Sequence, residues 1–152
     1  MEIERKFLIK SSPRNLSGFP CTHIRQGYFP LADKNLEIRL REKGSEHFVT
    51  IKAGRGRARL EEEVPISKKQ FDALWPLVRA NCIEKKRYRI PCDGRTIELD
   101  LYQGRHRGLK TADIEFRSTN QSDAFEPPDW LGTEITGKRR YANETLARRG
   151  RT

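Results

Sequence analysis

The chain has 152 residues, of which 31 are Lys or Arg and 21 are Asp or Glu, so its formal net charge is +10. This length suits one domain with one core, because domains commonly run to about 100–150 residues. A disordered basic tail is excluded, because the chain also carries seven Phe, two Trp and four Tyr. The positive surplus predicts a polyanionic partner, which charge alone leaves open between nucleic acid, an anionic membrane and a small phosphate-rich ligand.

Other classes of protein are excluded by how residues are distributed. The apolar runs span only a few residues, far short of the roughly 20 that cross a membrane. The first six residues contain acids where a signal peptide has a cationic start, so we expect a cytoplasmic protein. Cys21, Cys82 and Cys92 include no C-x-x-C pair, which favours free thiols over disulfides or a zinc site. No G-x-x-x-x-G-K-[ST] motif occurs, which excludes a P-loop nucleotide site.

Apolar and polar residues alternate with a period of two, which predicts a chain built mainly of β-strands. The first five strands are expected at 1–10, 22–29, 36–41, 47–52 and 57–66. Ser67-Lys-Lys-Gln70 reads as a capping box for a helix over 67–78, which Pro76 kinks or shortens. Three more strands follow at 83–90, 97–102 and 110–117, with Asp93-Gly94 as a hairpin signal. One helical turn is expected at 122–125 and a helix at 143–149.

The charged face of these strands is unusual. An ordinary antiparallel sheet with one solvated face would also alternate. Here, however, the charges come in same-sign pairs two residues apart. The pairs are Glu2/Glu4, Arg39/Arg41, Arg57/Arg59, Glu61/Glu63, Lys85/Arg87, Glu98/Asp100 and Asp113/Glu115. Such side chains lie about 6.6 Å apart on one face of a strand, so they repel unless an opposite charge lies between them.

The pairs of each sign suit a different ligand. A carboxylate pair suits a divalent cation with oxygen ligands, such as Mg²⁺, Mn²⁺ or Ca²⁺. An arginine pair suits phosphate oxygens, which the guanidinium fork binds bidentately. An eight-stranded sheet that closes leaves an interior just wide enough for a small ligand. The pattern therefore indicates a container for a metal–polyphosphate complex, beside the alternative of a solvated sheet.

Glu2-Ile-Glu4-Arg-Lys6 is an E-x-E-x-K motif, and further blocks follow it in order. They are Arg25-Gln-Gly-Tyr28, Glu37-Ile-Arg39-Leu-Arg41, Thr50-Ile-Lys52, Arg59-Leu-Glu61-Glu-Glu63, Lys85-Lys-Arg87-Tyr88, Glu98-Leu-Asp100, Asp113-Ile-Glu115-Phe116 and Arg140-Tyr141-Ala-Asn143. From Glu2 to Ala147 the chain resembles the CYTH superfamily, the triphosphate tunnel metalloenzymes. It is most similar to the short bacterial members that hydrolyse inorganic tripolyphosphate.

This resemblance implies a fold and a site. The fold would be a closed tunnel of eight antiparallel strands with helices outside, forming a single domain over residues 1–152. The triphosphate would be held by Lys6, Arg39, Arg41, Lys52, Arg87 and Arg139. Mg²⁺ or Mn²⁺ would be held by Glu2, Glu4, Asp113 and Glu115, with Glu61, Glu63 and Asp100 supporting a second metal or its water. Lys6 and Tyr28 would take part in catalysis.

Two positions depart from the family pattern. Asp113 stands where the family usually has Glu, and Lys138 stands where an acid is common. The shorter side chain of Asp113 would weaken or shift a metal contact. The positive charge of Lys138 would alter the contact between the C-terminal lid and the ligand.

The resemblance predicts hydrolysis of inorganic tripolyphosphate to phosphate and pyrophosphate. Within the family, adenylate cyclase and thiamine triphosphatase activities are alternatives. A rival from another class is a nucleic-acid- or polyphosphate-binding module without turnover, to which the Gly54–Arg59 tract of Arg and Gly would contribute. The enzyme hypothesis expects a small-molecule substrate and no nucleic-acid or membrane partner, and it leaves a homodimer open.

Overall fold

The computed structural model of the chain describes residues 3–54 and 60–149. Its strands are β1 (Ile3–Ile9), β2 (Cys21–Tyr28), β3 (Leu36–Lys43), β4 (Glu46–Ala53), β5 (Leu60–Pro65), β6 (Cys82–Cys92), β7 (Arg95–Tyr102), β8 (Lys110–Phe116) and β9 (Leu131–Glu134). Its α-helices are α1 (Lys68–Leu74), α2 (Thr119–Ala124) and α3 (Asn143–Arg149). Short 3₁₀ turns are η1 (Leu16–Gly18), η3 (Trp75–Leu77), η4 (Arg79–Asn81), η5 (Gly104–His106) and η6 (Arg139–Tyr141). The predicted turn and strand start at 55–59 lie outside the described residues.

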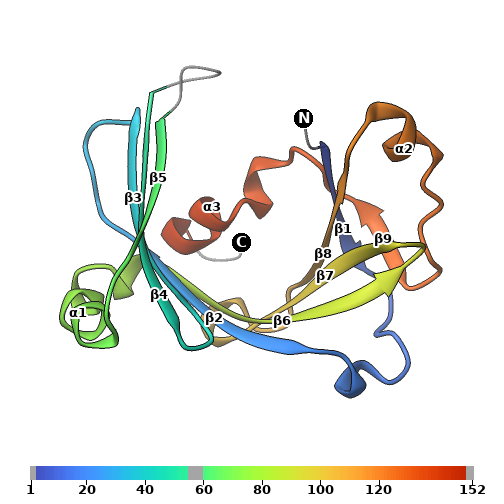
Figure 1. Cartoon of the computed structure of the whole chain (residues 1–152), viewed down its shortest axis with the longest axis horizontal. Coiled ribbons are helices and arrows are strands. Elements are labelled where there is room, and N and C mark those ends of the chain that lie inside the picture. Colours follow the sequence, from blue (N-terminus) through green and yellow to red (C-terminus); the bar gives the residue numbers. More distant parts are fainter. Residues whose placement is uncertain (1–2, 55–59, 150–152) are drawn as a thin grey trace.

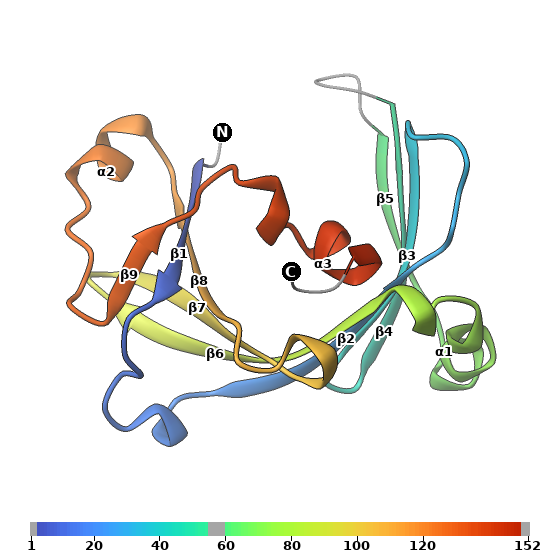
Figure 2. The same ribbon diagram turned by 180° about the vertical axis from the view of Figure 1, so that it is seen from behind.

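The strands form one antiparallel sheet in the order β5-β4-β3-β2-β6-β7-β8-β1-β9. The sheet curls into a trough, with β3, β4 and β5 in one wall and β1, β8 and β9 in the other (Figures 1 and 2). The mainly β, antiparallel prediction is confirmed. The closed eight-stranded barrel is not: across the described ranges there are nine strands, and β5 and β9 are two edges that do not pair with each other.

The additional strand, β9, was not predicted from the sequence. It has only four residues, and it pairs with β1 through Ile9–Leu131 and Phe7–Glu134 across a shift of register. Four residues are too few for alternation to be recognised, because the signal needs a longer run. The strand exists because β1 offers it a hydrogen-bonding edge.

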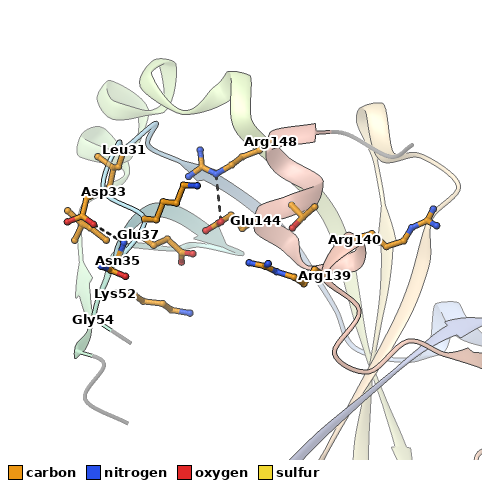
Figure 3. A pocket seen from close by; sticks show the side chains of 13 residues that line it. Leu31, Asp33, Asn35, Glu37, Lys52, Gly54, Arg139, Arg140, Glu144 and Arg148 are labelled. Carbon is orange, nitrogen blue, oxygen red and sulfur yellow. Dashed lines mark hydrogen bonds and ion pairs between the residues drawn. The ribbon is translucent and has the colours of Figure 1, made fainter. Parts of the chain in front are cut away.

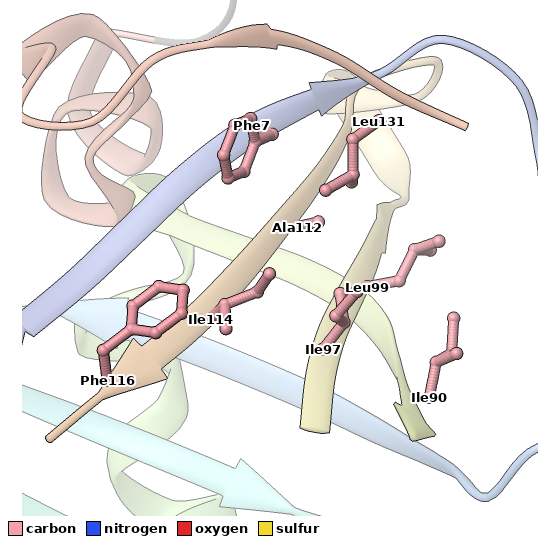
Figure 4. Packing of buried hydrophobic residues seen from close by; sticks show 8 residues of the cluster. All are labelled: Phe7, Ile90, Ile97, Leu99, Ala112, Ile114, Phe116 and Leu131. Carbon is pink, nitrogen blue, oxygen red and sulfur yellow. The ribbon is translucent and has the colours of Figure 1, made fainter. Parts of the chain in front are cut away.

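The convex face of the sheet carries the largest apolar cluster, in line with the predicted alternation. Its members come from β1, β6, β7, β8 and β9 and lie together on one side of the strands (Figure 4). They are Phe7, Ile90, Ile97, Leu99, Ala112, Ile114, Phe116 and Leu131. Burial of one such large side chain contributes about 1.5–3 kcal/mol, so this cluster is a main source of stability.

Helix α1 covers the convex face of the opposite wall. The predicted capping box is present, with Ser67 accepting from the Gln70 backbone and the Gln70 side chain accepting from Ser67 N–H. The helix ends at Leu74 and continues as a 3₁₀ turn that contains Pro76, which confirms the shortened helix. Phe71 of α1 is fully buried against β3 and β4.

Helix α3 lies inside the trough, between its two walls (Figures 1 and 2). Leu146 and Ala147 pack on Tyr28, Ile83 and Tyr102 of the concave face. Hydrogen bonds fix the helix at its first residue and at its middle: the Tyr102 hydroxyl donates to Asn143 Oδ1 over 2.7 Å, and His106 Nε2 donates to the Leu146 carbonyl over 2.6 Å. The predicted helix at 143–149 is confirmed, and α2 is longer than the single turn expected at 122–125.

Two further observations concern disulfide bonds and membrane-spanning helices. Cys21, Cys82 and Cys92 are all free thiols, as predicted. Among the helices of the described segments, none has the length and apolar character to cross a membrane.

Candidate functional site

Within the described residues, the concave face of the trough collects charged side chains from seven strands, all except β2 and β9. The cross-strand register makes this plain, because residues directly opposite on neighbouring strands point to the same face. On one side of the trough Lys6 lies opposite Asp113, which lies opposite Glu98. On the other side Tyr28 lies opposite Arg39, which lies opposite Thr50. We call the first side the β6–β1 wing (β6, β7, β8 and β1) and the second the β2–β5 wing (β2, β3, β4 and β5).

In the β6–β1 wing a buried carboxylate binds two cations. Asp100 is fully buried, and its oxygens accept from Lys85 Nζ over 2.8 Å and from Arg87 Nε and Nη2 over 2.8 and 2.9 Å. Burial disfavours the charged form of Asp100, yet the two cations hold its pKa below its usual range. Burial lowers the pKa of Lys85 to about 8, although Asp100 opposes this shift. The three side chains form a preorganised unit in the floor of the trough, in which one carboxylate offsets one of the two positive charges.

Higher on the same wing two carboxylates lie close together. Asp113 is 8% exposed, and Glu4, whose side chain is more exposed to solvent, lies beside it. Burial raises the pKa of Glu4, and the charge of Asp113 raises it further. Lys6 Nζ is 3.8 Å from Asp113 Oδ1 and 3.5 Å from the Tyr141 carbonyl oxygen. Over the described parts of the chain Asp113 Oδ1 is buried without a hydrogen-bond partner, and the Lys6 ammonium is shared between the two carboxylates, so this corner has an excess of negative charge.

This corner fits a divalent cation that keeps some water. Among residues 3–54 and 60–149, no three His, Cys, Asp or Glu side chains already converge as a metal cage. Mg²⁺ commonly binds through one or two carboxylates together with substrate phosphates and waters, so a cage is not required. Glu4 and Asp113 supply the two carboxylates, and Glu115 lies opposite Glu4 in the register. Glu2, the fourth predicted ligand here, lies outside the described residues.

In the β2–β5 wing the arginines lack such partners. In the region that the structure describes, the Nε atoms of Arg39 and Arg41 are buried without a hydrogen-bond partner. Burial lowers the pKa of Arg41, and the charges of Arg39 and Arg87 lower it further. Leaving a buried donor unpaired costs about 1–3 kcal/mol, and more when it is charged. An anion between the arginines would remove this cost.

Tyr28 lies at the base of the same wing, under α3. Its side chain is 2% exposed, and its hydroxyl accepts a hydrogen bond from Gln26 Nε2 over 2.6 Å. Burial raises the pKa of Tyr28, while Arg39 and Gln26 oppose the shift. Tyr28 therefore stays protonated over the physiological range.

A cavity of about 810 Å³ opens where the β2–β5 wing faces α3 and η6. Figure 3 shows Arg139 directed from η6 toward Lys52 and Glu37 across this space. Burial raises the pKa of Glu37 to about 7, helped by its hydrogen bond with Glu144 of α3. The hydrogen bond between Glu37 and Glu144 thus joins β3 to α3 beside two cations.

The predicted site residues divide between the two wings. The β6–β1 wing carries Glu4, Lys6, Arg87, Asp100, Asp113 and Glu115, and the β2–β5 wing carries Tyr28, Arg39, Arg41, Lys52, Glu61 and Glu63. Arg139 lies on η6, between the wings. Glu61 and Glu63 lie on the edge strand β5, across the trough from Asp113. Glu61 Oε1 is 3.6 Å from Lys52 Nζ, and Glu63 accepts a hydrogen bond from the Thr50 hydroxyl over 3.4 Å. Lys6 and Tyr28 share the concave face, with β6, β7 and β8 between their strands.

Three residues of the site were not assigned from the sequence. Lys85 was recognised as the pair-mate of Arg87, but its bond to Asp100 depends on the β6–β7 register. Gln26 occupies the motif around Tyr28, yet only the structure shows the contact of its amide. Glu144 belongs to a predicted helix, and only the placement of α3 in the trough brings it to Glu37.

The fold and the charged trough define a mainly β protein whose concave face carries both basic and acidic side chains. The CYTH domain family matches residues 1–150. An inorganic triphosphatase of Nitrosomonas europaea is 41% identical over 149 residues, which are 96% of each chain. An inorganic triphosphatase of Acetivibrio thermocellus is 35% identical over 150 residues, covering 97% of this chain and 93% of the relative.

A crystal structure of an inorganic triphosphatase also resembles this fold. It superposes with a TM-score of 0.83 at 38% identity, covering 97% of this chain and 95% of that one. The chain belongs to the CYTH domain family, as its motifs predicted.

Proposed function

We propose that this protein hydrolyses a triphosphate, inorganic tripolyphosphate above all, to phosphate and pyrophosphate on the concave face of its sheet. The observation that carries the proposal is the pair of buried guanidinium Nε atoms that have no partners among the described residues. They face a wing whose carboxylates Glu4 and Asp113 have only the Lys6 ammonium between them. The arginines need an anion, and the two carboxylates need a further cation. A metal–triphosphate complex supplies both. The naming of the two relatives as inorganic triphosphatases supports the same substrate.

In this proposal the basic residues bind the substrate. Arg39 and Arg41 would grip phosphate oxygens on one side, and Lys6 and Arg87 would do so on the other. Lys52 and Arg139 face each other across the adjoining cavity and would bind the end of the chain of phosphates. With the anion between them, the two walls attract each other through it, and we propose that the trough then closes toward the tunnel expected from the motifs.

The acidic residues would hold Mg²⁺ or Mn²⁺. Glu4, Asp113 and Glu115, with Glu2, would bind the first ion, while Glu61, Glu63 and Asp100 would support a second ion or its water. When bound, the metal neutralises phosphate charge and favours ionisation of water. Both oxygens of Asp100 already accept from Lys85 and Arg87, so its first effect is to orient these cations.

The protein's own contribution to the reaction is position and charge. A water oxygen forms a bond to a terminal phosphorus while the bond from that phosphorus to the bridging oxygen breaks, and the protons of water leave with phosphate and solvent. Lys6 and Tyr28 would donate hydrogen bonds to the oxygens on which negative charge develops. The raised pKa of Tyr28 suits this role, since the phenol keeps its proton.

A panel of triphosphates tests the proposal. The purified protein is incubated with Mg²⁺ or Mn²⁺ and tripolyphosphate, ATP or thiamine triphosphate, and phosphate, pyrophosphate and cyclic AMP are measured. We expect phosphate and pyrophosphate from tripolyphosphate, at a higher rate than from the nucleotide or the thiamine ester. Cyclic AMP as the main product would assign a cyclase instead, and salt-sensitive binding without turnover would assign a polyanion-binding module.

The remaining expectations follow from the same proposal. A small-molecule substrate requires neither nucleic acid nor a membrane as partner. The three free thiols suit the reducing cytoplasm. A homodimer is tested by light scattering on the purified chain.

A further inference from the structure

The hydroxyl of Tyr28 has an unusual set of neighbours. Gln26 Nε2 donates to it over 2.6 Å, and both side chains are 2% exposed. Arg39, directly opposite Tyr28 on β3, is within hydrogen-bonding reach of the same oxygen. Arg148 of α3 lies 5.8 Å from the centre of the ring and donates to the Phe29 carbonyl over 3.3 Å, which fixes the ring from the other side.

The donors around the Tyr28 hydroxyl determine to which group it can donate its own hydrogen. The amide nitrogen of Gln26 and the guanidinium of Arg39 carry only donors, so neither can accept from Tyr28. With its lone pairs facing these donors, the hydroxyl has one hydrogen left to donate to a third group. A phosphate oxygen held between Arg39 and Arg41 is such an acceptor, and Gln26 lies opposite Arg41 in the β2–β3 register.

We propose that Gln26 is a positioning residue: its amide fixes the Tyr28 hydroxyl so that the O–H donates toward the triphosphate. Gln26 acts through Tyr28, because its amide nitrogen is engaged by the hydroxyl and the side chain is buried. Strand geometry supports this, since residues i and i+2 share a face about 6.6 Å apart, within reach of a glutamine side chain. The inference rests on the proposed triphosphatase function and names a further residue of that site.

A double-mutant cycle tests the inference with Gln26→Leu, Tyr28→Phe and the double variant. Gln26→Leu keeps the volume and removes the donor, so we expect kcat for tripolyphosphate to fall about 10- to 100-fold with KM little changed. Because Gln26 acts through Tyr28, the double variant should be no slower than Tyr28→Phe alone. Wild-type kcat in Gln26→Leu, or losses that simply multiply in the double variant, would overturn the inference.

A second measurement does not depend on turnover. With isotope-labelled tyrosine, the Tyr28 resonance is assigned by its absence from Tyr28→Phe and then titrated with pH. A donated hydrogen bond favours the phenolate, so Gln26→Leu should titrate at higher pH than the wild type. An unchanged titration would overturn the Gln26 contact. A wild type that titrates as expected but releases no phosphate from any triphosphate would instead refute the proposed function.

Discussion

The two wings of the trough carry similar numbers of charged side chains but differ in how these are paired. In the β6–β1 wing, Lys85 and Arg87 reach a shared carboxylate at 2.8 Å. In the β2–β5 wing, the buried Nε atoms of Arg39 and Arg41 have no hydrogen-bond partner among the residues described, and Lys52 is 3.6 Å from its carboxylate. The difference indicates that Lys85 and Arg87 are held by an internal carboxylate, while Arg39 and Arg41 keep their Nε donors for an external anion.

The largest expected effect concerns the carboxylates that face the unpaired arginines. Glu4→Gln removes a metal ligand, so phosphate release should fall by at least about a hundredfold, because bound metal stabilises the transition state by several kcal/mol. The same change removes the repulsion between Glu4 and Asp113, so thermal stability should not fall. Phosphate assays and thermal unfolding check both parts. An active Glu4→Gln enzyme would remove the metal corner from the site.

Loss of a cation should lower the free energy of unfolding more in the β6–β1 wing than in the β2–β5 wing. Lys85→Met leaves Asp100 buried beside one cation, and breaking a buried pair costs about 3–5 kcal/mol. Because Arg87 still binds Asp100, we expect the lower end of this range. Arg41→Met removes a buried charge without a partner at Nε and should cost much less.

Urea unfolding of the two variants measures this contrast. The double variant Lys85→Met/Asp100→Asn is the matched control, because it removes the carboxylate together with its cation and should recover part of the loss. Equal losses in Lys85→Met and Arg41→Met would show that the wings do not differ in pairing.

A smaller effect, on the pH dependence of stability, is expected where the β2–β5 wing meets α3. The pKa of Glu37 is about 7 in the folded protein, above its ordinary value of 4.5, through burial and then Glu144. Folded protein therefore keeps a proton that the unfolded chain releases between these values, so stability falls as pH rises through this window. Lys52 and Arg39 also face Glu37 and limit the shift.

Glu37→Gln cannot lose this proton, so its stability should gain on the wild type as pH rises from about 5 to about 8. The free energy of unfolding as a function of pH measures the gain. Glu144→Gln, which alters the other carboxyl of the pair, should behave in the same way. A constant difference from the wild type at all pH values would contradict the raised pKa of Glu37.

Much of this architecture could be read from the sequence, for a local reason. A strand places every second side chain on one face, so the pairs Arg39/Arg41 and Asp113/Glu115 could be assigned to a common face without any structure. The cap at Ser67 and the stop at Pro76 are equally local. Properties that depend on which strands meet were not accessible in this way.

The features that the sequence did not predict all depend on contacts between residues far apart in the chain. The bond between Lys85 and Asp100 requires the register of β6 and β7, and β9 exists only beside β1. Whether the sheet closes depends on contacts between the edge strands β5 and β9, which alternation does not encode. The raised pKa of Glu37 depends on its contact with Glu144, which requires α3 to lie in the trough.

Binding of tripolyphosphate to the arginine pair is the most direct test of the difference between the wings. Calorimetric titration in EDTA, where turnover is not expected, compares the wild type with Arg41→Met and with Lys86→Met, an exposed residue of β6 that controls for the loss of one positive charge. A hydrogen bond to a charged group contributes about 1.5–3 kcal/mol, so Arg41→Met should weaken binding about 10- to 100-fold. Lys86→Met should bind nearly as the wild type does. Equal weakening in both variants would contradict the assignment of Arg39 and Arg41 to an anion, because only the net charge would then matter.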